Sequence, residues 1–265
     1  MKIIVINGFN SFIGNSFYKK YKEKYKILKY KEDINNIQKL KLFTRKNNFD
    51  YFIHFAALSR LKCDTNKTKC KKTNYLSLKK IINHFNTLKI KPGFIFISSS
   101  HVYANSKKKL TENSKKKPNS LYGKLKLDSE NYLKKNYEKY CILRLFNVYG
   151  KDQPKNFFIP DMKRKIKNNE LIQLTKSIRD FIHINDVIKI IQFFVKKELY
   201  GEFNVGSGQG MFLTSIVKMI SSITKIKSKI EIINKSDKLI ANISKLRKVG
   251  YTFKINKIRK INLNS

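Results

Sequence analysis

The stretch KIIVINGFNSFIG at residues 2–14 is the part of the sequence that most directly indicates the fold. Its first six residues form an apolar, β-branched run that ends at Gly8, as expected for a strand buried on both faces. Gly8 permits a tight turn, and Gly14 lets a following helix pack close to the strand. The free backbone N–H groups at the start of that helix suit a pyrophosphate. We therefore predict a strand, a glycine turn and a helix, which is the context of a dinucleotide-binding site.

The turn departs from a GxxGxxG pattern, because Ser11 occupies the position of the middle glycine. A small hydroxyl side chain is compatible with a bound phosphate, although it reduces the clearance of the backbone. Taken alone, the turn also fits an ordinary connection between a strand and a helix.

Further apolar runs follow the first along the chain, at residues 25–28, 52–55, 93–97 and 141–146. Helical stretches separate them, including residues 77–85 and 124–139. Strands that alternate with helices indicate right-handed βαβ crossovers. We therefore predict an α/β fold with a Rossmann-type doubly wound parallel sheet, whose ligands bind beyond the carboxyl ends of the strands.

The alternation becomes looser after Lys151, where Pro154 and Pro160 precede a predicted helix. We expect residues 1–155 to form the dinucleotide-binding domain, to which residues 180–205 return. Residues 156–179 and 206–265 are expected to form a smaller C-terminal substrate-binding part.

Lysine dominates the charge of the chain. Its 265 residues include 58 Lys and Arg against 18 Asp and Glu, a formal net charge of +40. A basic surface of this kind attracts nucleic acids and anionic membranes. Seven of these residues are Arg, the side chain best suited to read guanine edges and phosphates, and the lysines are spread among abundant Asn and Ile. We interpret the charge as a codon-usage bias and expect no nucleic-acid partner.

The three cysteines, Cys63, Cys70 and Cys141, are odd in number and lack CxxC spacing. We therefore expect neither a metal site nor a disulfide framework, and interpret them as reduced thiols of a cytoplasmic protein. No stretch approaches the ~18–20 uncharged apolar residues of a membrane span, and residues 1–14 lack the layout of a signal peptide. The fold is expected to begin at the first residues.

Tyr122 and Lys126 are four residues apart, so they lie on one face of a predicted helix. An ammonium near a phenol favours the phenolate and lowers its pKa from about 10 toward neutrality. Such a pair suits proton transfer. A strand end rich in hydroxyl groups, FISSSHVY at residues 96–103, precedes the pair and offers partners for a substrate oxygen. An amphipathic surface helix with an incidental Tyr and Lys is the alternative in so lysine-rich a chain.

These motifs resemble those of the extended short-chain dehydrogenases/reductases, the superfamily of nucleotide-sugar epimerases, dehydratases and reductases. The resemblance covers nearly the whole chain, in family order: the glycine turn, IHFAA at 53–57, Asn74, residues 98–103, YGKLK at 122–126, RLFNVYG at 144–150, RDFIHINDV at 179–187 and FNVGSG at 203–208. Asn242 departs from the C-terminal signature, where the family usually has an acidic residue.

The resemblance implies roles for individual residues. Tyr122 would be the acid/base, Lys126 would lower its pKa and bind the nicotinamide ribose, and Ser99 would bind the reacting sugar oxygen. The residues expected at the cofactor, NADP or NAD, are Gly8, Ser11, Phe12, Ile13, Gly14, Lys31, Asp33, Ile34, Ala56, Ala57 and Lys126. Those expected at the partner, a nucleotide-diphosphate sugar, are Ser99, Ser100, His101, Tyr122, Asn147 and Arg179. His54 and His183 lie in apolar runs and are interpreted as core histidines.

Two features of the sequence indicate which reaction of the superfamily to expect. Ser100 and His101 stand where the family's 4,6-dehydratases have an acidic pair, so a dehydratase is not expected. The end of the second predicted strand carries Lys29 and Lys31 in place of the acidic residue typical of NAD-selective members, and cations suit the 2′-phosphate of NADP. We therefore expect 4-keto reduction of an NDP-6-deoxy-4-ketohexose, a reaction of polysaccharide biosynthesis.

Two alternatives stay open. One is an NAD-dependent NDP-sugar 4-epimerase, and the other is a catalytically silent nucleotide-binding regulatory protein. Family members often dimerise through the helices that include the Tyr/Lys helix, so a homodimer is also expected.

Overall fold

The computed structural model describes residues 1–252, 254 and 255, and the chain divides into two compact units. Unit 1 contains residues 1–104, 114–144 and 190–203. Unit 2 contains residues 105–113 and 145–189 together with the segment from residue 204 onward. Each unit is therefore built from segments that are distant in the sequence.

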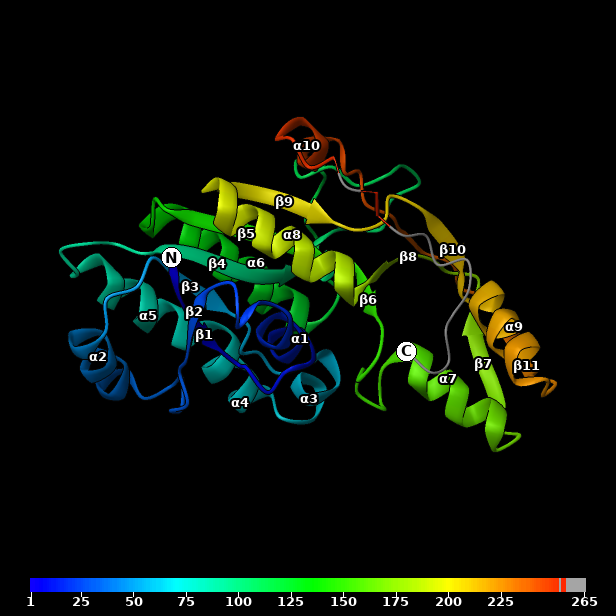
Figure 1. Cartoon of the computed structure of the whole chain (residues 1–265). Coiled ribbons are helices and arrows are strands. Elements are labelled where there is room, and N and C mark those ends of the chain that lie inside the picture. Colours follow the sequence, from blue (N-terminus) through cyan, green and yellow to red (C-terminus); the bar gives the residue numbers. More distant parts are fainter. Residues whose placement is uncertain (253, 256–265) are drawn as a thin grey trace. The chain divides into compact units, whose positions relative to one another are not determined.

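Unit 1 is organised around a six-stranded sheet with the order β2-β1-β3-β4-β5-β9 (Figure 1). The strands are β1 (Ile3–Asn7), β2 (Lys26–Lys29), β3 (Tyr51–His54), β4 (Gly93–Ser99), β5 (Tyr140–Leu145) and β9 (Gly201–Val205). β1 pairs in parallel with β2 and β3, and β3 pairs in parallel with β4. The strand order reverses at β1, which confirms the predicted doubly wound, Rossmann-type parallel sheet.

The central strands form because their residues are apolar on both faces. Every residue of β3 and β4 is buried, as their continuous apolar runs predicted. β1 alternates between the two faces of the sheet: Val5 packs against Phe52 and Phe94 in one cluster, while its neighbours Ile4 and Ile6 are also fully buried. The sheet therefore needs helices on both sides.

Helices cover the sheet of unit 1. They include α1 (Phe12–Tyr21), α2 (Ile37–Lys46), α3 (Arg60–Thr65), α4 (Lys67–Lys71), α5 (Ser77–Asn86), α6 (Leu121–Asn136) and the part of α8 (Ile184–Lys197) from residue 190 onward. A π-helix, Lys72–Leu76, joins α4 to α5, and a 3₁₀ turn, Ser100–Val102, follows β4. Leu40, Ile81 and Leu133 bring α2, α5 and α6 into one cluster with the sheet. Phe17 of α1 contacts the ring of Phe55 after β3.

Unit 2 contains smaller sheets and its own core. β8 (Ile178–His183) pairs with β10 (Gly210–Phe212), β12 (Lys238–Leu239) and β6 (Asn147–Tyr149), and β7 (Leu171–Thr175) pairs in parallel with β11 (Lys229–Ile233). The helices α7 (Phe158–Lys167) and α9 (Leu213–Thr224) pack on these strands through Ile166, Phe181 and Ile216. A short helix, α10 (Ser244–Lys248), follows β12.

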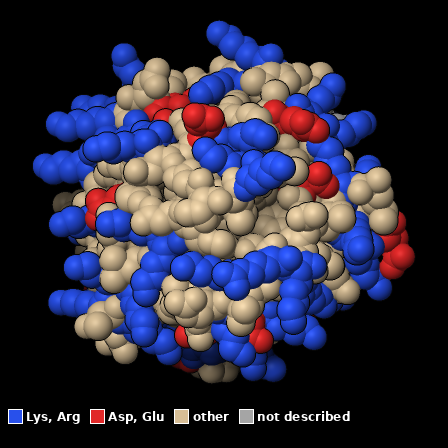
Figure 2. Space-filling model, turned by 90° about the vertical axis from the view of Figure 1, so that its left-hand side faces the viewer, with Lys and Arg blue, Asp and Glu red and all other residues tan. Residues whose placement is uncertain are grey.

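Lysine side chains are spread over the surface. Figure 2 shows one face on which Lys and Arg alternate with uncharged residues, with a few acidic side chains between them. Among the residues that the structure describes, no helix is long and apolar enough to cross a membrane. Within the same residues, no group of three or more His, Cys, Asp or Glu side chains is placed to hold a metal ion.

The bonding state of two of the cysteines differs from expectation. Cys63 and Cys70 were predicted to be reduced thiols, but the structure joins them in a disulfide with their Cα atoms 5.0 Å apart. Asn66 is both the C-cap of α3 and the N-cap of α4, so the chain turns there and brings the two cysteines together. Cys141 is buried and lies outside this disulfide. The spacing of seven residues could not reveal the pairing, because it depends on that turn.

Candidate active site

The glycine turn after β1 packs closely against neighbouring backbone. Gly8 adopts a φ of +61°, and a Cβ at this position would lie 2.5 Å from the backbone nitrogen of Ala56. A Cβ at Gly14 would lie 2.5 Å from the carbonyl oxygen of Gly8. Both positions therefore require glycine, because a side chain would meet the backbone of the loop after β3 or of the turn itself. The start of α1 is where the pyrophosphate of NAD(P) is expected.

Ser11 has a structural role within this turn. It is the N-cap of α1, and its Oγ accepts a hydrogen bond from the Gly14 N–H at 3.2 Å. Its own N–H donates to the Gly8 carbonyl at 2.9 Å. The serine in place of the usual middle glycine thus stabilises the first turn of α1. Phe12 and Ile13 follow as the first helical residues.

Asn7 joins the glycine turn to the loop after β3, a role that no motif of the sequence indicated. Its Oδ1 accepts the Ala56 N–H at 3.0 Å, and its Nδ2 lies 2.7 Å from Nδ1 of His54. His54 is buried, and burial lowers its pKa to about 3, so the ring is neutral. This confirms His54 as a core histidine and places Ala56, with Ala57 after it, beside the glycine turn.

The end of β2 carries a positioned cation. The Lys29 ammonium lies 3.5 Å from the ring centre of Tyr18 on α1 and 5.5 Å from that of Phe9 in the glycine turn. Lys31, the residue expected at the cofactor, is exposed. Lys29 is therefore the lysine that the structure places beside the turn.

The two other residues expected near the adenine also lie after β2. Asp33 is exposed, and its Oδ1 accepts hydrogen bonds from the backbone and side chain of Asn35, each at 2.9 Å. Ile34 is buried in the cluster formed with α2 and α5.

Tyr122, Ser99 and His101 lie together at the carboxyl end of β4. Tyr122 hydrogen-bonds Ser99, and its ring meets that of His101 edge-on with the centroids 5.8 Å apart. The Ser99 Oγ also accepts the His101 N–H at 3.3 Å. Gly123 makes this approach of α6 feasible, because a Cβ there would lie 2.4 Å from the His101 carbonyl oxygen. Ser100, between the two, is buried in the 3₁₀ turn.

Lys126 is almost fully buried below Tyr122, with 3% of its surface exposed. Its ammonium donates to the Ile97 carbonyl at 2.6 Å and lies 4.6 Å from the ring centre of Phe96. Burial lowers the pKa of Lys126 to about 7, and the Glu130 carboxylate acts against that change.

The pKa of Tyr122 differs from expectation. The ammonium of Lys126 lies 5.9 Å from the centre of the Tyr122 ring and is directed to the Ile97 carbonyl. Burial raises the pKa of Tyr122, and the Ser99 hydrogen bond acts in the opposite direction. In the cofactor-free protein the phenol is therefore protonated near neutral pH, whereas the four-residue spacing predicted a lowered pKa.

A buried ion-pair network continues the row of side chains along α6. Glu130, four residues after Lys126, is fully buried and accepts hydrogen bonds from Ser98 and from Arg144, the latter at 2.7 Å. Arg144 also donates to the Tyr103 hydroxyl at 2.8 Å and pairs with Glu202. The continued four-residue spacing from 122 through 126 to 130 was the signal that could have pointed to Glu130.

Asn147 and Arg179 lie on neighbouring strands of unit 2. The Asn147 side chain donates to the Asp180 carbonyl at 2.9 Å. The Arg179 guanidinium pairs with the Asp237 carboxylate at 2.5 Å and donates to the Ile178 carbonyl at 3.0 Å. Beside this pair is a hollow of about 520 Å³, which is lined by Asn105, Ser106, Lys107, Lys176, Ile178, Ser236, Asp237 and Lys238.

Asp180 organises unit 2 from within. Its carboxylate is fully buried and accepts hydrogen bonds from the backbone N–H groups of Ser207, Gly208 and Ala241 at 2.7–3.1 Å. Burial raises its pKa to about 6, against the effect of these hydrogen bonds. Asp180, the first of the two acidic residues in the RDFIHINDV motif, therefore holds the FNVGSG segment in place.

The sequence and fold can be compared with those of known proteins. The family described as "NAD dependent epimerase/dehydratase family" matches residues 4–206. The ADP-L-glycero-D-manno-heptose-6-epimerase of Brachyspira hyodysenteriae is 30% identical over 248 residues, which cover 83% of this chain and 76% of that protein. The GDP-6-deoxy-D-talose 4-dehydrogenase of Aggregatibacter actinomycetemcomitans is 26% identical over 238 residues, or 84% of this chain and 80% of that protein.

Solved structures agree on the fold. The dTDP-4-dehydrorhamnose reductase of Bacillus anthracis, in complex with NADP, has a TM-score of 0.85 at 20% identity, with 97% of this chain and 94% of that chain covered. The UDP-glucose 4-epimerase of Thermus thermophilus, in complex with NAD, has a TM-score of 0.84 at 15% identity, with 96% and 95% covered. Together with the glycine turn and the Tyr122/Lys126 pair, the family match leads to one conclusion. The chain belongs to the NAD-dependent epimerase/dehydratase family, within the extended short-chain dehydrogenases/reductases, and is an NAD(P)-dependent enzyme.

Proposed function

We propose that the protein reduces the 4-keto group of an NDP-6-deoxy-4-ketohexose. The observation that carries this proposal is the state of Tyr122: its phenol is hydrogen-bonded to Ser99, and burial raises its pKa. A protonated phenol is the form that reduction of a carbonyl requires, because the carbonyl oxygen must receive a proton. Bound NADPH or NADH supplies the hydride.

The chain's own groups have distinct tasks in this proposal. Tyr122 donates the proton, and Ser99 orients both the phenol and the sugar oxygen. Lys126 binds the nicotinamide ribose. After Tyr122 has donated its proton, the Lys126 ammonium returns a proton to the phenolate. His101, whose ring meets that of Tyr122, contacts the sugar and tunes specificity. Ser100 and His101 offer no carboxylate for the elimination of water, so no dehydratase step is proposed.

The nucleotide part of the substrate is assigned to unit 2, and the cofactor to unit 1. Asn147 and Arg179 are proposed to contact the diphosphate, for which a guanidinium fork is well suited. Arg179 already pairs with Asp237, so it would bind the diphosphate with its remaining donors or exchange partners. Lys107, Lys176 and Lys238 around the adjacent hollow favour an anionic ligand there.

A panel of nucleotide-linked 4-keto sugars with NADPH tests the reaction. Stoichiometric oxidation of NADPH, together with a product two mass units heavier than the sugar, supports the reductase. Absence of turnover across the panel, in protein that binds NADPH, would contradict it. Tyr122→Phe serves as the matched control for background reduction.

A 4-epimerase is the second candidate. The Brachyspira relative named above is an epimerase. In addition, the Lys29 ammonium already contacts the Tyr18 ring, so it is less available to bind the 2′-phosphate of NADP than a lysine without such a contact. An epimerase converts its sugar with no change of mass and no net consumption of cofactor. Calorimetric titration with both cofactors separates the candidates further: NAD binding at least tenfold tighter than NADP, about 1.4 kcal/mol, would favour the epimerase.

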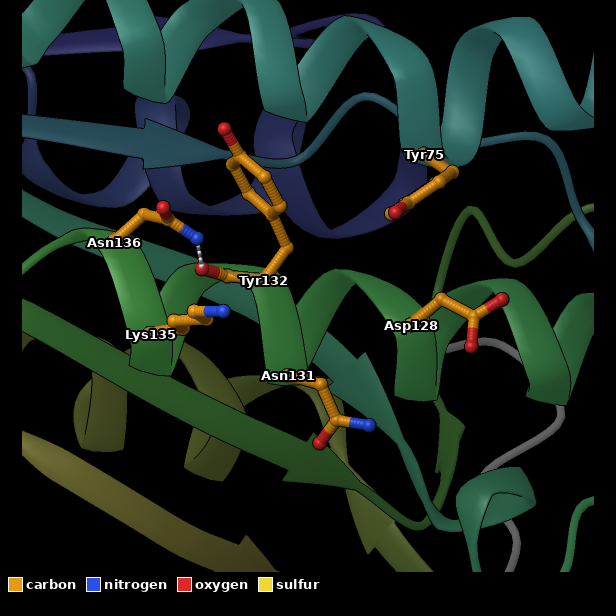
Figure 3. A pocket seen from close by; sticks show the side chains of 6 residues that line it. All are labelled: Tyr75, Asp128, Asn131, Tyr132, Lys135 and Asn136. Atoms are coloured by element: carbon orange, nitrogen blue, oxygen red, sulfur yellow. Dashed lines mark hydrogen bonds between the residues drawn. The ribbon is translucent and has the colours of Figure 1, made fainter.

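We also propose a homodimer that uses the outer face of α6. Tyr75, Asp128, Asn131, Tyr132, Lys135 and Asn136 line a hollow of about 380 Å³ on this face, and Figure 3 shows their side chains. The Tyr132 ring stands between α6 and the neighbouring helix, so Tyr132→Glu should shift the protein to monomer in light-scattering measurements. A wild-type monomer at all concentrations would contradict this. The cytoplasmic location expected from the sequence likewise stays a proposal.

A further inference from the structure

Cys63 and Cys70 are two buried sulfur atoms that the proposed reaction does not use. They lie on the short helices α3 and α4, both are fully buried, and they form a disulfide. Disulfides of intracellular enzymes are most often transient, with catalytic or redox-sensing roles. The residues that contact this disulfide determine what its reduction would change in this NAD(P)-dependent protein.

Asn74 connects the disulfide to the loop after β3. It lies on the π-helix four residues after Cys70, and its Nδ2 is 3.5 Å from the sulfur atoms of both cysteines. The same amide is bonded to the backbone of Leu58: Nδ2 donates to the Leu58 carbonyl at 2.9 Å, and Oδ1 accepts the Leu58 N–H at 2.7 Å. Leu58 directly follows Ala56 and Ala57, so one side chain joins the sulfur atoms to the loop expected to line the cofactor path.

The disulfide also packs against the helix that carries the acid/base pair. Cys63 and Cys70 form one buried cluster with Leu125 of α6, and Tyr122 packs against that cluster. The Ser129 hydroxyl, one turn further along α6, donates to the Asn74 carbonyl at 2.9 Å. A change at the sulfur atoms therefore reaches both the cofactor loop and the surroundings of Tyr122.

We propose that Cys63 and Cys70 are a reversible oxidation site that controls cofactor binding. In the oxidised state the disulfide fixes α3, α4 and, through Asn74, the Leu58 loop. Reduction breaks the sulfur–sulfur bond, and the two thiols separate because they can no longer stay at bonding distance. The loop then loses its constraint and must be ordered when the cofactor binds.

Oxidation and reduction of the two cysteines require a small disulfide and a dithiol as reaction partners. A low-molecular-weight disulfide oxidises the pair: the sulfur–sulfur bond of the small disulfide breaks, and a bond forms between Cys63 and Cys70. The two electrons and two protons that leave the cysteine thiols are taken up by the small disulfide, which is released as two small thiols. A dithiol reverses the step. Access is through α3, a six-residue helix whose outer residues are exposed, including Leu61 at 52%, and such short surface elements open at low free energy.

Thiol titration of the full-length protein tests the proposal and needs no sugar substrate. The protein is equilibrated with oxidised and reduced glutathione over a range of ratios, quenched in acid, denatured and alkylated. Mass spectrometry should show one adduct, on Cys141, in the oxidised form and three in the reduced form, with a reversible transition between them. Three adducts at every ratio would overturn the proposal, as would one adduct that dithiothreitol cannot convert to three.

Binding of NADPH, followed by its fluorescence, tests the consequence. The oxidised form should bind NADPH about 5- to 20-fold more tightly than the reduced form, a typical range for coupling between two sites. The Cys63→Ser/Cys70→Ser double variant should lose this redox dependence, and Cys141→Ser should retain it. Equal affinity of the two wild-type redox forms would overturn the regulatory role, and it can be recognised without any variant. The effect on turnover rests on the proposed reductase function, whereas thiol titration and NADPH binding do not. Failure of the redox proposal can therefore be distinguished from failure of the proposed reductase function.

Discussion

Replacement of Lys126 by Met should stabilise the cofactor-free protein while it abolishes activity. The lysine is 3% exposed, and burial lowers its pKa from 10.5 to about 7. Each pKa unit corresponds to about 1.4 kcal/mol, so below pH 7 the buried ammonium costs about 5 kcal/mol relative to the unfolded chain. Methionine fills a similar volume without a charge. Loss of the hydrogen bond to the Ile97 carbonyl offsets part of the gain, by about 1–2 kcal/mol.

The stability of the wild type depends on pH through the titration of Lys126. Between pH 7 and 10.5 the unfolded chain holds a proton on Lys126 that the folded protein has released, so the stability of the wild type rises with pH across this window. Lys126→Met lacks this dependence. Its advantage over the wild type should therefore shrink by about 3 kcal/mol between pH 6 and pH 9.

Urea denaturation of both proteins at pH 6 and pH 9, without cofactor, measures the difference. Lys124→Met, at an exposed position of the same helix, is the matched control and should change the stability by less than about 0.5 kcal/mol at either pH. A stability difference for Lys126→Met that is the same at both pH values would refute the reasoning, because Lys126 would then not titrate between them. His54, on which the charge of Lys126 acts, has a pKa of about 3 and therefore stays neutral between pH 6 and pH 9.

Three further predictions concern other parts of the site. Gly14→Ala should weaken NADPH binding at least tenfold in a fluorescence titration, because the new Cβ would lie 2.5 Å from the Gly8 carbonyl oxygen; unchanged affinity would show that the turn does not bind the pyrophosphate. Asp180→Asn should lower the free energy of unfolding by about 2–4 kcal/mol in chemical denaturation, since an amide NH₂ would face backbone donors that the carboxylate now accepts, and a neutral effect would count against that role. Arg179→Lys should raise the KM for the nucleotide sugar about tenfold with little change in kcat or in NADPH affinity, because lysine lacks the guanidinium fork; an unchanged KM would remove Arg179 from the diphosphate.

The sheet of unit 1 was predictable because its signals are local. Apolar runs at residues 52–55 and 93–97 became β3 and β4, and the glycine turn lies where its spacing indicated. The spacing of Tyr122 and Lys126 likewise placed both on one face of α6. These features depend on neighbours within about one turn or one strand.

Other features depend on contacts that the sequence order does not show. The pairing of β7 with β11 joins residues 171–175 to residues 229–233, and neither segment signals the other. The direction of the Lys126 ammonium, toward the Ile97 carbonyl, follows from how α6 lies against β4. The burial that raises the pKa of Tyr122, against the expectation, likewise depends on tertiary packing. Asn7 was missed because a buried Asn at a strand end has no pattern of its own.

The most direct test of the proposed mechanism is the turnover of Tyr122→Phe on the nucleotide sugar that the wild type reduces. The phenylalanine ring retains the packing against Leu125 but cannot donate a proton. We expect turnover to fall by about 10²–10⁴-fold while the affinity for NADPH stays within about twofold of the wild type. Full activity of Tyr122→Phe, in protein that binds NADPH normally, would contradict the assignment of Tyr122 as the proton donor.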